Sequence, residues 1–553
     1  MFCNQCEQTA KGTGCTAAGV CGKDHNTAAL QDLLVYAVKG IAMYALRNRR
    51  LGVKDHESDV FIVKALFSTV TNVNFDPERL RSLLVKAGEL IEKAERSYIE
   101  ATQKAGQKPE QLNGPATWRP VNDLAQLISQ GEAVGYQENI EKLGPDIAGL
   151  LNMVAFGIKG MAAYVEHARI LGVEDDQVYA FFHQGMAFLA KPQFTMDELV
   201  GMALKVGEVN LRVMELLDGA NTSTYGHPAP TKVRITPVKG KAILISGHDL
   251  KDLAELLEQT AGKGINIYTH GEMLPAHGYP NLKKHPHLLG NYGGAWQNQK
   301  EEFDKFPGAI LMTTNCIQKP AESYQGRIFT TGLVAWPGVK HVENHNFGPV
   351  IEAAIQAPGF SGDEPEKYIT VGFGRNAVLN AADKIVSAVK AGKIRHFFLI
   401  GGCDGVKSGR SYFTELAQKV PDDCIILTLA CGKYRFNKLE FGTIEGIPRL
   451  LDVGQCNDAY SAIKIAEALA NIFQTDVNHL PLSLILSWYE QKAVSILLSL
   501  LHLGIKNIRI GPSMPAFITP AVYETLKQNF NLLPITNPDE DLQAILGKVG
   551  LMK

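Results

Sequence analysis

Length and charge set the first limits on this chain. Its 553 residues are too many for one hydrophobic core, and at about 150 residues per domain they would form roughly three or four domains. Lys and Arg number 55 against 57 Asp and Glu, so the formal net charge of -2 gives no attraction to nucleic acid or to an anionic membrane. No apolar stretch reaches the roughly 20 residues of a membrane span, so we expect small molecules or proteins as partners.

The chain begins with a cysteine-rich loop. Its start lacks the charged and apolar regions of a signal peptide, so we expect a cytoplasmic protein with reduced thiols. Cys3, Cys6, Cys15 and Cys21 are separated by two, eight and five residues, close enough for one metal centre to bind all four. Structural zinc sites also begin Cys-x2-Cys, and plain thiols are a further alternative. The spacing favours an iron-sulfur centre, because zinc ribbons usually place a second Cys-x2-Cys.

A helical region follows, from about residue 27 to residue 218. Its apolar residues recur every three or four positions, which is typical of helices. Residues 39–44 and 51–53 recur as residues 159–164 and 171–173, an offset of 120. Asp76 precedes a proline, and Thr195 precedes Glu198 by three positions, which are helix-start signals. We expect two stacked bundles of three helices each, forming with the cysteine loop a domain over residues 1–222.

Beyond a polar stretch at residues 221–237, short apolar runs alternate with amphipathic helices. This pattern is typical of parallel α/β sheets. We expect strands at residues 242–246, 265–269, 309–313, 368–371, 396–400, 424–429, 450–453, 482–486 and 507–510. A Pro- and Gly-rich stretch near residues 357–367 would divide them into two Rossmann-like α/β domains with parallel sheets, at 223–360 and 361–553. The expected fold class is therefore multidomain α and α/β.

The remaining candidate metal ligands each follow the end of a predicted strand. They are His248, Glu272, Cys316, Cys403, Cys431, Cys456 and Glu490. Open parallel sheets bind ligands at the carboxyl ends of their strands, so these residues could converge on one cavity. Thiolates suit iron-sulfur units, whereas imidazole and carboxylate suit harder, oxygen-bridged iron. The set therefore favours a cluster that is part sulfide and part oxo, with an open face.

Plainer interpretations exist for single members of this set. Lone cysteines are often buried hydrophobes, and this is our interpretation of Cys424, which begins a strand. His248 could cap the next helix, and Glu272 and Glu490 could be solvated acids at helix starts. Lys492 lies two residues from Glu490 and could supply a proton, but we favour a surface lysine.

Motifs along the whole chain resemble those of the hybrid cluster protein family, also called prismane proteins or hydroxylamine reductases. They are the N-terminal cysteine spacing and the segments ISGHD at 245–249, THGEMLP at 269–275, TTNC at 313–316, GCDG at 402–405, CGKYR at 431–435, GQCND at 454–458 and WYEQK at 488–492. The resemblance implies that the four N-terminal cysteines hold a [4Fe-4S] cluster, as in the anaerobe-type class of the family. It also implies that the seven strand-end residues hold a hybrid [4Fe-2O-2S] cluster and that Cys403 carries a persulfide.

The resemblance implies an iron-sulfur oxidoreductase that reduces hydroxylamine to ammonia and water. Nitric oxide, reduced to nitrous oxide, is a second candidate substrate. An unidentified donor protein would supply the electrons. The expected catalytic residues are His248, Glu272, Cys403 and Glu490. Two alternatives stay open: a redox or nitrosative-stress sensor or nitrosothiol-transfer protein, and carbon monoxide dehydrogenase-like activity. The oxygen and nitrogen donors favour an all-iron site over a nickel-iron-sulfide cluster, which would draw more heavily on thiolate.

Overall fold

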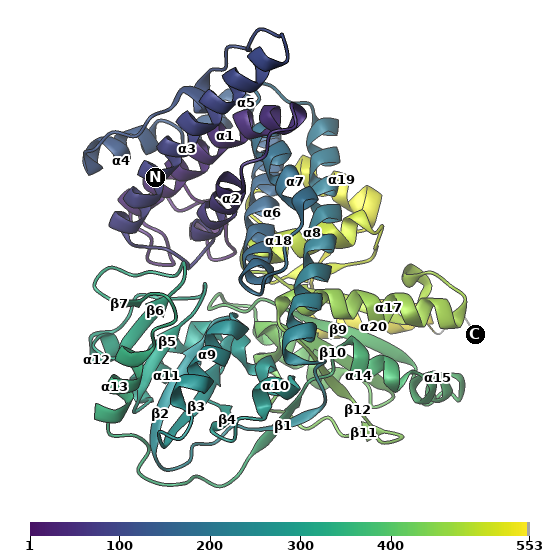
Figure 1. Cartoon of the computed structure of the whole chain (residues 1–553). Coiled ribbons are helices and arrows are strands. Elements are labelled where there is room, and N and C mark those ends of the chain that lie inside the picture. Colours follow the sequence, from purple (N-terminus) through teal and green to yellow (C-terminus); the bar gives the residue numbers. More distant parts are fainter. Residues whose placement is uncertain (550–553) are drawn as a thin grey trace.

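The protein is described from a computed structural model covering residues 1–549 (Figure 1). Helices of the N-terminal region make up one half of the molecule, and two β-sheets with their covering helices make up the other. Short elements precede and link the main helices: η1 (Ala10–Gly12), η2 (Gly114–Thr117), α4 (Leu124–Glu132) and α5 (Tyr136–Leu143).

The helical half contains the internal repeat as two three-helix units. The first is α1 (His25–Arg50), α2 (His56–Ser68) and α3 (Pro77–Lys104), and the second is α6 (Pro145–Ile170), α7 (Asp176–Phe188) and α8 (Met196–Tyr225). The helices α6 and α7 begin 120 residues after α1 and α2, which confirms the offset. Both start signals are also confirmed: Asp76 caps α3, and Thr195 forms a capping box with Glu198 at the start of α8.

Two of these helices, α1 and α6, are long and apolar enough to cross a membrane, so the expectation that no apolar stretch reaches that length is wrong. Their most apolar 18-residue windows are 72% and 89% buried inside the protein, respectively. Burial on this scale is the behaviour of core helices, because a membrane span would present its apolar face to lipid. The apolar side chains of the two units form one continuous core.

The larger sheet has eight strands in the order β7-β6-β5-β2-β3-β4-β1-β8. Its strands are β1 (Thr231–Arg234), β2 (Lys241–Ser246), β3 (Ile265–His270), β4 (Leu288–Asn291), β5 (Ala309–Met312), β6 (Ile328–Thr331), β7 (Lys340–Val342) and β8 (Tyr368–Val371). The connecting helices are α9 (Leu250–Thr260), η3 (Gly271–Gly278), α10 (Pro280–Lys283), η4 (Trp296–Asn298), α11 (Gln299–Lys305), α12 (Glu322–Gln325) and α13 (Gly348–Gln356). All pairs are parallel except β1 with β8.

The second sheet has six parallel strands in the order β13-β10-β9-β14-β15-β16. They are β9 (His396–Gly402), β10 (Cys424–Leu429), β13 (Leu450–Gly454), β14 (Leu482–Ser487), β15 (Arg509–Gly511) and β16 (Leu533–Pro534), and a separate ribbon pairs β11 (Thr443–Ile444) with β12 (Ile447–Pro448). The accompanying helices are α14 (Arg375–Asn380), α15 (Ala382–Lys390), α16 (Ser411–Lys419), η5 (Cys431–Arg435), η6 (Cys456–Asp458), α17 (Ala459–Phe473), η7 (Val477–His479), α18 (Gln491–His502), α19 (Pro520–Phe530) and α20 (Pro538–Val549).

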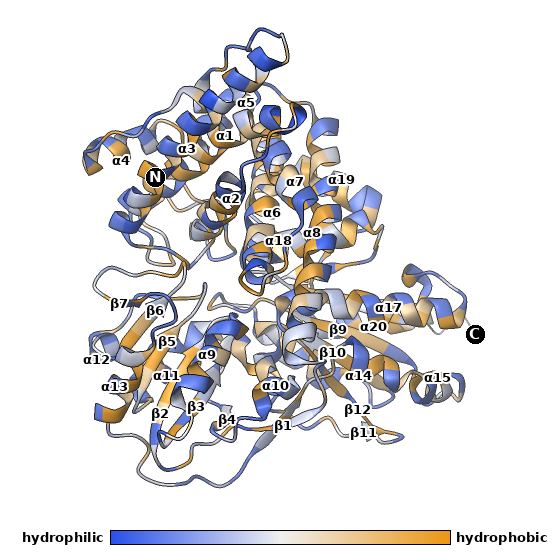
Figure 2. Ribbon diagram, viewed as in Figure 1, coloured by the Kyte–Doolittle hydropathy of each residue, from blue (hydrophilic) through white to orange (hydrophobic). Residues whose placement is uncertain are grey.

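These sheets confirm the expected fold class. Many inner strand residues are apolar, as Figure 2 shows, because helices cover both faces of a parallel sheet. The strand β8 comes from the segment expected in the last domain, yet it pairs with β1 in the larger sheet. The domain boundaries at 222 and 360 stay a prediction.

The helix α18 joins the second sheet to the second helical unit (Figure 1). It lies against α6 and α8, where two glycines allow close approach. A Cβ atom at Gly160 would lie 2.9 Å from Cα of Lys492, and one at Gly207 would lie 2.9 Å from the amide nitrogen of Ser499. Ser499 Oγ also donates to the Gly207 carbonyl at 2.9 Å. The start of α18, next to Glu490, is therefore fixed from the helical half.

Candidate metal centres

The N-terminal loop brings its four cysteines together as free thiols. Cys3 and Cys15 pair through their backbones, with N···O distances of 3.0 and 2.8 Å. Burial, followed by the charges of Cys21, Cys3 and Cys15, raises the pKa of Cys6. The amide of Ala10 donates to Sγ of Cys15 at 3.3 Å, a hydrogen bond that favours a thiolate. The loop therefore fits a centre bound by four thiolates, as its spacing predicted.

A buried positive charge accompanies this loop. Lys23 is only 4% exposed. Burial lowers its pKa, but the opposing charges of Cys3 and Cys21 outweigh burial and leave the pKa of Lys23 raised. Lys159 Nζ reaches the loop as well and donates to Oε1 of Gln5 at 2.8 Å. The ammonium group of Lys23 offsets the negative charge that four thiolates would concentrate there, whereas burial lowers the pKa of Lys159 to about 7.

Tight turns at the strand ends position the other candidate ligands. Gly247 precedes His248 with φ 125°, and Gly402 precedes Cys403 with φ 106°. Both values lie in the region that favours glycine. A Cβ at Gly247 would lie 2.8 Å from Oγ1 of Thr314, so a larger residue could not turn the chain here. The sequence pattern of strand followed by glycine thus fixes where these side chains point.

Two non-glycine residues near the ends of β5 and β10 show backbone strain. Cys316 itself has φ 80°, and Ala430, directly before Cys431, has φ 61°. Such conformations cost about 1–3 kcal/mol and persist where the surroundings determine them. Gln299 reinforces the first turn, because its Nε2 donates to the carbonyl of Cys316 at 2.5 Å. Strain at Cys316 and at the residue before Cys431 fits a functional site.

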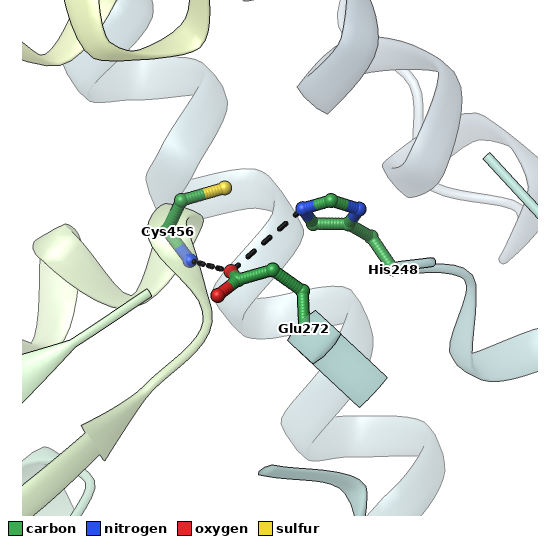
Figure 3. Close-up of side chains that lie close together, drawn as sticks. All are labelled: His248, Glu272 and Cys456. Carbon is green, nitrogen blue, oxygen red and sulfur yellow. Dashed lines mark hydrogen bonds and ion pairs between the residues drawn. The ribbon is translucent and has the colours of Figure 1, made fainter. Parts of the chain in front are cut away.

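Three of the predicted ligands meet within one small space (Figure 3). Ligand atoms of His248, Glu272 and Cys456 all lie within 4.8 Å of one another. His248 Nε2 is 3.7 Å from Oε2 of Glu272, which accepts a hydrogen bond from the Cys456 amide at 2.8 Å. The other oxygen, Oε1 of Glu272, is buried and has no hydrogen-bond partner within residues 1–549. An orphaned buried oxygen on a carboxylate that also lies against an imidazole and a cysteine fits a metal ligand.

The other four predicted ligands surround this trio. Burial is the main cause that raises the pKa of Cys316, and the charges of Glu490, Glu272 and Cys403 raise it further. Cys431 in turn has its pKa raised by burial and then by the charges of Glu272 and Cys316. The structure therefore brings all seven strand-end residues together. Cys424 lies at the opposite end of β10 from Cys431, which confirms its separate, structural interpretation.

The burial of Glu272 and Glu490 decides whether they are solvated acids at helix starts. Glu272 and Glu490 are 5% and 3% exposed, so the view of them as solvated acids is wrong. Glu490 does cap α18, accepting from the Lys492 amide at 2.9 Å, but it does so inside the protein. Asp249, and not His248, caps α9. Burial raises the pKa of the Glu272 and Glu490 carboxyls and lowers that of His248. Without a compensating cation, each of these groups would therefore favour its neutral form.

Lys492 is buried, and the expectation of a surface lysine is wrong. It is 2% exposed, because α18 is held against α6 and α8. Its Nζ lies 3.0 Å from Nε2 of His248, 2.9 Å from Oδ1 of Asn315 and 3.6 Å from Oε1 of Glu490. Burial lowers its pKa, but the charges of Cys456 and Glu490 outweigh burial and raise it. A charged amine therefore stands within the ligand set.

Two aromatic rings lie between the two cysteine groups. The rings of Trp296 and Tyr489 contact each other at a tilt of 38° with centroids 4.5 Å apart, and they share one buried cluster with Cys6 and Cys431. The carbonyl of Tyr489 accepts from the Glu7 amide at 2.8 Å, which ties the N-terminal loop to the turn between β14 and α18 that carries Glu490. The two candidate centres are thus neighbours in space despite their separation in sequence.

Further residues at the site were not identified from the sequence. Gln455 Nε2 donates to the carbonyls of His248 and Glu272 at 3.1 and 2.7 Å, holding both turns together. His167 of α6 stacks on His248 at 6.4 Å, and burial lowers the pKa of His167 to about 3. Gln455 stands beside Cys456 in a resembling motif and could have been found there. His167 lies within an apolar helix and carries no such signal.

The fold and this donor set define a class: multidomain proteins that present thiol, imidazole and carboxylate ligands at the ends of parallel strands. Residues 1–543 match the model of the Prismane/CO dehydrogenase family, and the chain belongs to that family. Hydroxylamine reductase of Syntrophobacter fumaroxidans is 59% identical over 547 residues, covering 99% of this chain and 100% of that protein. Hydroxylamine reductase of Geobacter sulfurreducens is 58% identical over 551 residues, with the same coverage.

Solved structures share the fold at low sequence identity. Nickel-free carbon monoxide dehydrogenase from Thermococcus sp. AM4 matches with a TM-score of 0.55 and 17% identity, over 99% of this chain and 90% of that one. Carbon Monoxide Dehydrogenase IV from Carboxydothermus hydrogenoformans matches with a TM-score of 0.55 and 15% identity, over 98% and 90%. These likenesses confirm the arrangement of helices and sheets.

Proposed function

We propose that this chain is a hydroxylamine reductase, which converts hydroxylamine to ammonia and water. The observation that carries the proposal is the buried trio of His248, Glu272 and Cys456, with its orphaned carboxylate oxygen. Full-length relatives named hydroxylamine reductase support the same activity. Reduction of nitric oxide to nitrous oxide is a further reaction that such a site would suit.

The donor chemistry supports two clusters. The four N-terminal thiols would hold a [4Fe-4S] cluster, and the seven strand-end residues would hold a hybrid [4Fe-2O-2S] cluster. A persulfide on Cys403 belongs to this proposal. When bound, the hybrid cluster would supply an open iron site that acts as a Lewis acid and a source of electrons.

Lys492 lies where its ammonium group can hold a proton and offset negative charge at this site. Cleavage of the nitrogen-oxygen bond of hydroxylamine consumes two electrons and two protons and yields ammonia and water. The Nζ atom holds a proton between His248 and Asn315, and its positive charge offsets the buried thiolates and Glu490. The ring of His248 stacks on the ring of His167 of α6, so an imidazole of the helical half lies next to the ligand set. We assign Lys492 a proton-holding role and Asn315 the role of orienting it.

The N-terminal loop would receive electrons from a donor protein whose identity is open. Trp296 and Tyr489 lie between the loop and the second site, so the two centres would exchange electrons over a short, buried distance. The near-neutral chain would work with this donor in the cytoplasm. We assign the expected catalytic roles to His248, Glu272, Cys403 and Glu490.

Anaerobic turnover tests the proposal. The dye-reduced protein should convert hydroxylamine to ammonia over many cycles per chain, and His248→Ala or Glu490→Gln should lower that rate at least about tenfold. Cys456→Ser should lower the rate as well, and Cys424→Ser is its matched control, because Cys424 is buried away from the site. Unchanged turnover in both ligand variants would contradict the proposal. A single reaction per chain would instead support the alternative of a redox sensor or nitrosothiol-transfer protein.

Carbon monoxide oxidation is the second candidate, because two solved structures that share the fold are carbon monoxide dehydrogenases. The nitrogen and two oxygen donors of His248, Glu272 and Glu490 favour an all-iron, oxygen-bridged site. We therefore expect no carbon monoxide-dependent dye reduction. One nickel atom per chain in active protein would favour carbon monoxide chemistry instead.

A further inference from the structure

One face of α6 is turned toward the second site. Gly160, Tyr164 and His167 follow one another at spacings of four and three residues, which puts them on the same face of this helix. Gly160 packs against the backbone of Lys492, and the ring of His167 stacks on that of His248. Tyr164 lies between Gly160 and His167 along that face and is 1% exposed. Its phenol is therefore buried in the contact between α6 and the ligand set.

The internal repeat provides a comparison for this face. The corresponding positions in α1, 120 residues earlier, are Gly40, Tyr44 and Arg47. Tyr44 Oη donates to Oε1 of Glu95 at 3.0 Å. Arg47 Nε donates to Oε2 of Glu110 at 2.9 Å. Acids of α3 and of the segment after it thus satisfy the polar groups on the α1 face.

The α6 face carries two polar atoms without such partners. Oη of Tyr164 and Nε2 of His167 are both buried, and neither has a hydrogen-bond partner within residues 1–549. Buried polar groups in native proteins are nearly always paired, so an unpaired donor beside a set of metal ligands indicates a role at that site. Both copies of the repeat contain the tyrosine, but only α6 presents its hydroxyl to the second site.

The hydroxyl of Tyr164 lies beside a sulfur ligand. Burial raises the pKa of Tyr164, and interaction with Cys456 raises it further, ahead of the charge of Glu490. The hydroxyl therefore keeps its proton and remains a donor. Burial also raises the pKa of Cys456 to about 12, while Lys492 and the hydroxyl of Tyr164 act in the opposite direction. A hydroxyl hydrogen rotates to suit its surroundings, so it can be aimed at a neighbouring sulfur.

We propose that Tyr164 is a positioning residue of the second site, whose hydroxyl donates a hydrogen bond to Sγ of Cys456. This inference rests on the second cluster of the proposed function and deepens it. Reduction adds negative charge to a cluster, and a hydrogen bond to a ligand sulfur stabilises that charge. Tyr164 therefore raises the reduction potential of the second cluster, whereas Tyr44 has a structural role in the first helical unit.

Tyr164→Phe tests this role because it removes the hydroxyl and keeps the ring. In a reductive titration of the holoprotein followed by EPR, the equilibrium constant for reduction of the second cluster should fall about tenfold, a shift of about 59 mV for one electron. The N-terminal cluster has its own ligands and is the internal reference, so its potential should not change. An unchanged potential of the second cluster, or an equal shift of both clusters, would overturn the proposal.

Tyr44→Phe is the matched control, because it makes the same change at the equivalent position of α1, where the hydroxyl binds Glu95. It should leave both potentials unchanged, and a shift of the second cluster as large as in Tyr164→Phe would overturn the proposal. If Tyr164→Phe lost the second cluster, fluorotyrosine at position 164 would serve as the second variant. It keeps the hydroxyl and makes it a stronger donor, so the potential should rise, and an unchanged or lower potential would overturn the proposal.

The outcomes separate this role from the proposed function. If the potentials shift as expected but the wild-type protein does not reduce hydroxylamine, the proposed function fails while the role of Tyr164 stands. If the wild-type protein reduces hydroxylamine and Tyr164→Phe has an unchanged potential, only the role of Tyr164 fails.

Discussion

Close packing of α18 against α8 leads to a quantitative prediction for Gly207→Ala. An added Cβ would overlap the carbonyl of Leu498 and lie 2.9 Å from the amide nitrogen of Ser499, against about 3.5 Å for an ordinary contact. Overpacking of this kind costs about 1–3 kcal/mol. The shift would also displace the start of α18, where Glu490 and Lys492 lie, so hydroxylamine turnover should fall as well.

Gly219→Ala is the matched control, because it lies in the same helix and a Cβ there has no neighbour within 4 Å. It should stabilise the protein by about 0.5–1 kcal/mol, since Gly is a poorer helix former than Ala. Urea unfolding followed by circular dichroism would compare the two variants with the parent. If Gly207→Ala gained as much stability as Gly219→Ala, the inference that α18 is held by close backbone contact would be refuted.

Three further predictions concern separate parts of the chain. Cys3→Ser should abolish the EPR signal of the N-terminal cluster and leave that of the second site, and joint loss of both signals would contradict two separate ligand sets. Mass analysis of anaerobically alkylated peptides should find one added sulfur on Cys403, and a plain thiol in active protein would remove the persulfide from the proposal. Burial raises the pKa of Asp541, but hydrogen bonds from Tyr412 and Arg509 outweigh burial and leave its pKa lowered. Its contribution is therefore present above an unfolded pKa of about 3.9 and lost as pH falls through the folded value. Asp541→Asn should reduce the free energy of unfolding at pH 7 by about 1–3 kcal/mol, with the difference shrinking below about pH 4; a pH-independent difference would contradict this.

Local sequence patterns predicted most of the fold because each pattern has a local cause. The duplicated helical units followed from an exact offset in apolar residues and from the caps at Asp76 and Thr195. Strand ends were recognisable because glycine turns such as the one at Gly402 follow apolar runs. The short strands β1, β4, β6, β7, β11, β12 and β16 were missed, since two to four residues give too little alternation to recognise. The pairing of β8 with β1 depends on contacts across the sheet that no local pattern encodes.

The site residues show the same difference between what local patterns predict and what depends on distant contacts. The proposed ligands were found because their residue types are rare and their positions follow strands. Lys492 was misjudged because lysines are usually exposed, and only the docking of α18 against α6 buries it. His167 resembles an ordinary core residue in sequence. Its place beside His248 appears only when α6 packs against the end of β2.

The central claim is that this chain holds two iron clusters on separate ligand sets, one of them mixed in sulfur, nitrogen and oxygen donors. Anaerobic iron, sulfide and nickel analysis combined with EPR of the purified protein tests it most directly. The account predicts about eight iron atoms per chain, no stoichiometric nickel and two distinguishable cluster signals. About four iron atoms with a single signal, zinc in place of the N-terminal iron, or one nickel atom per chain would contradict it.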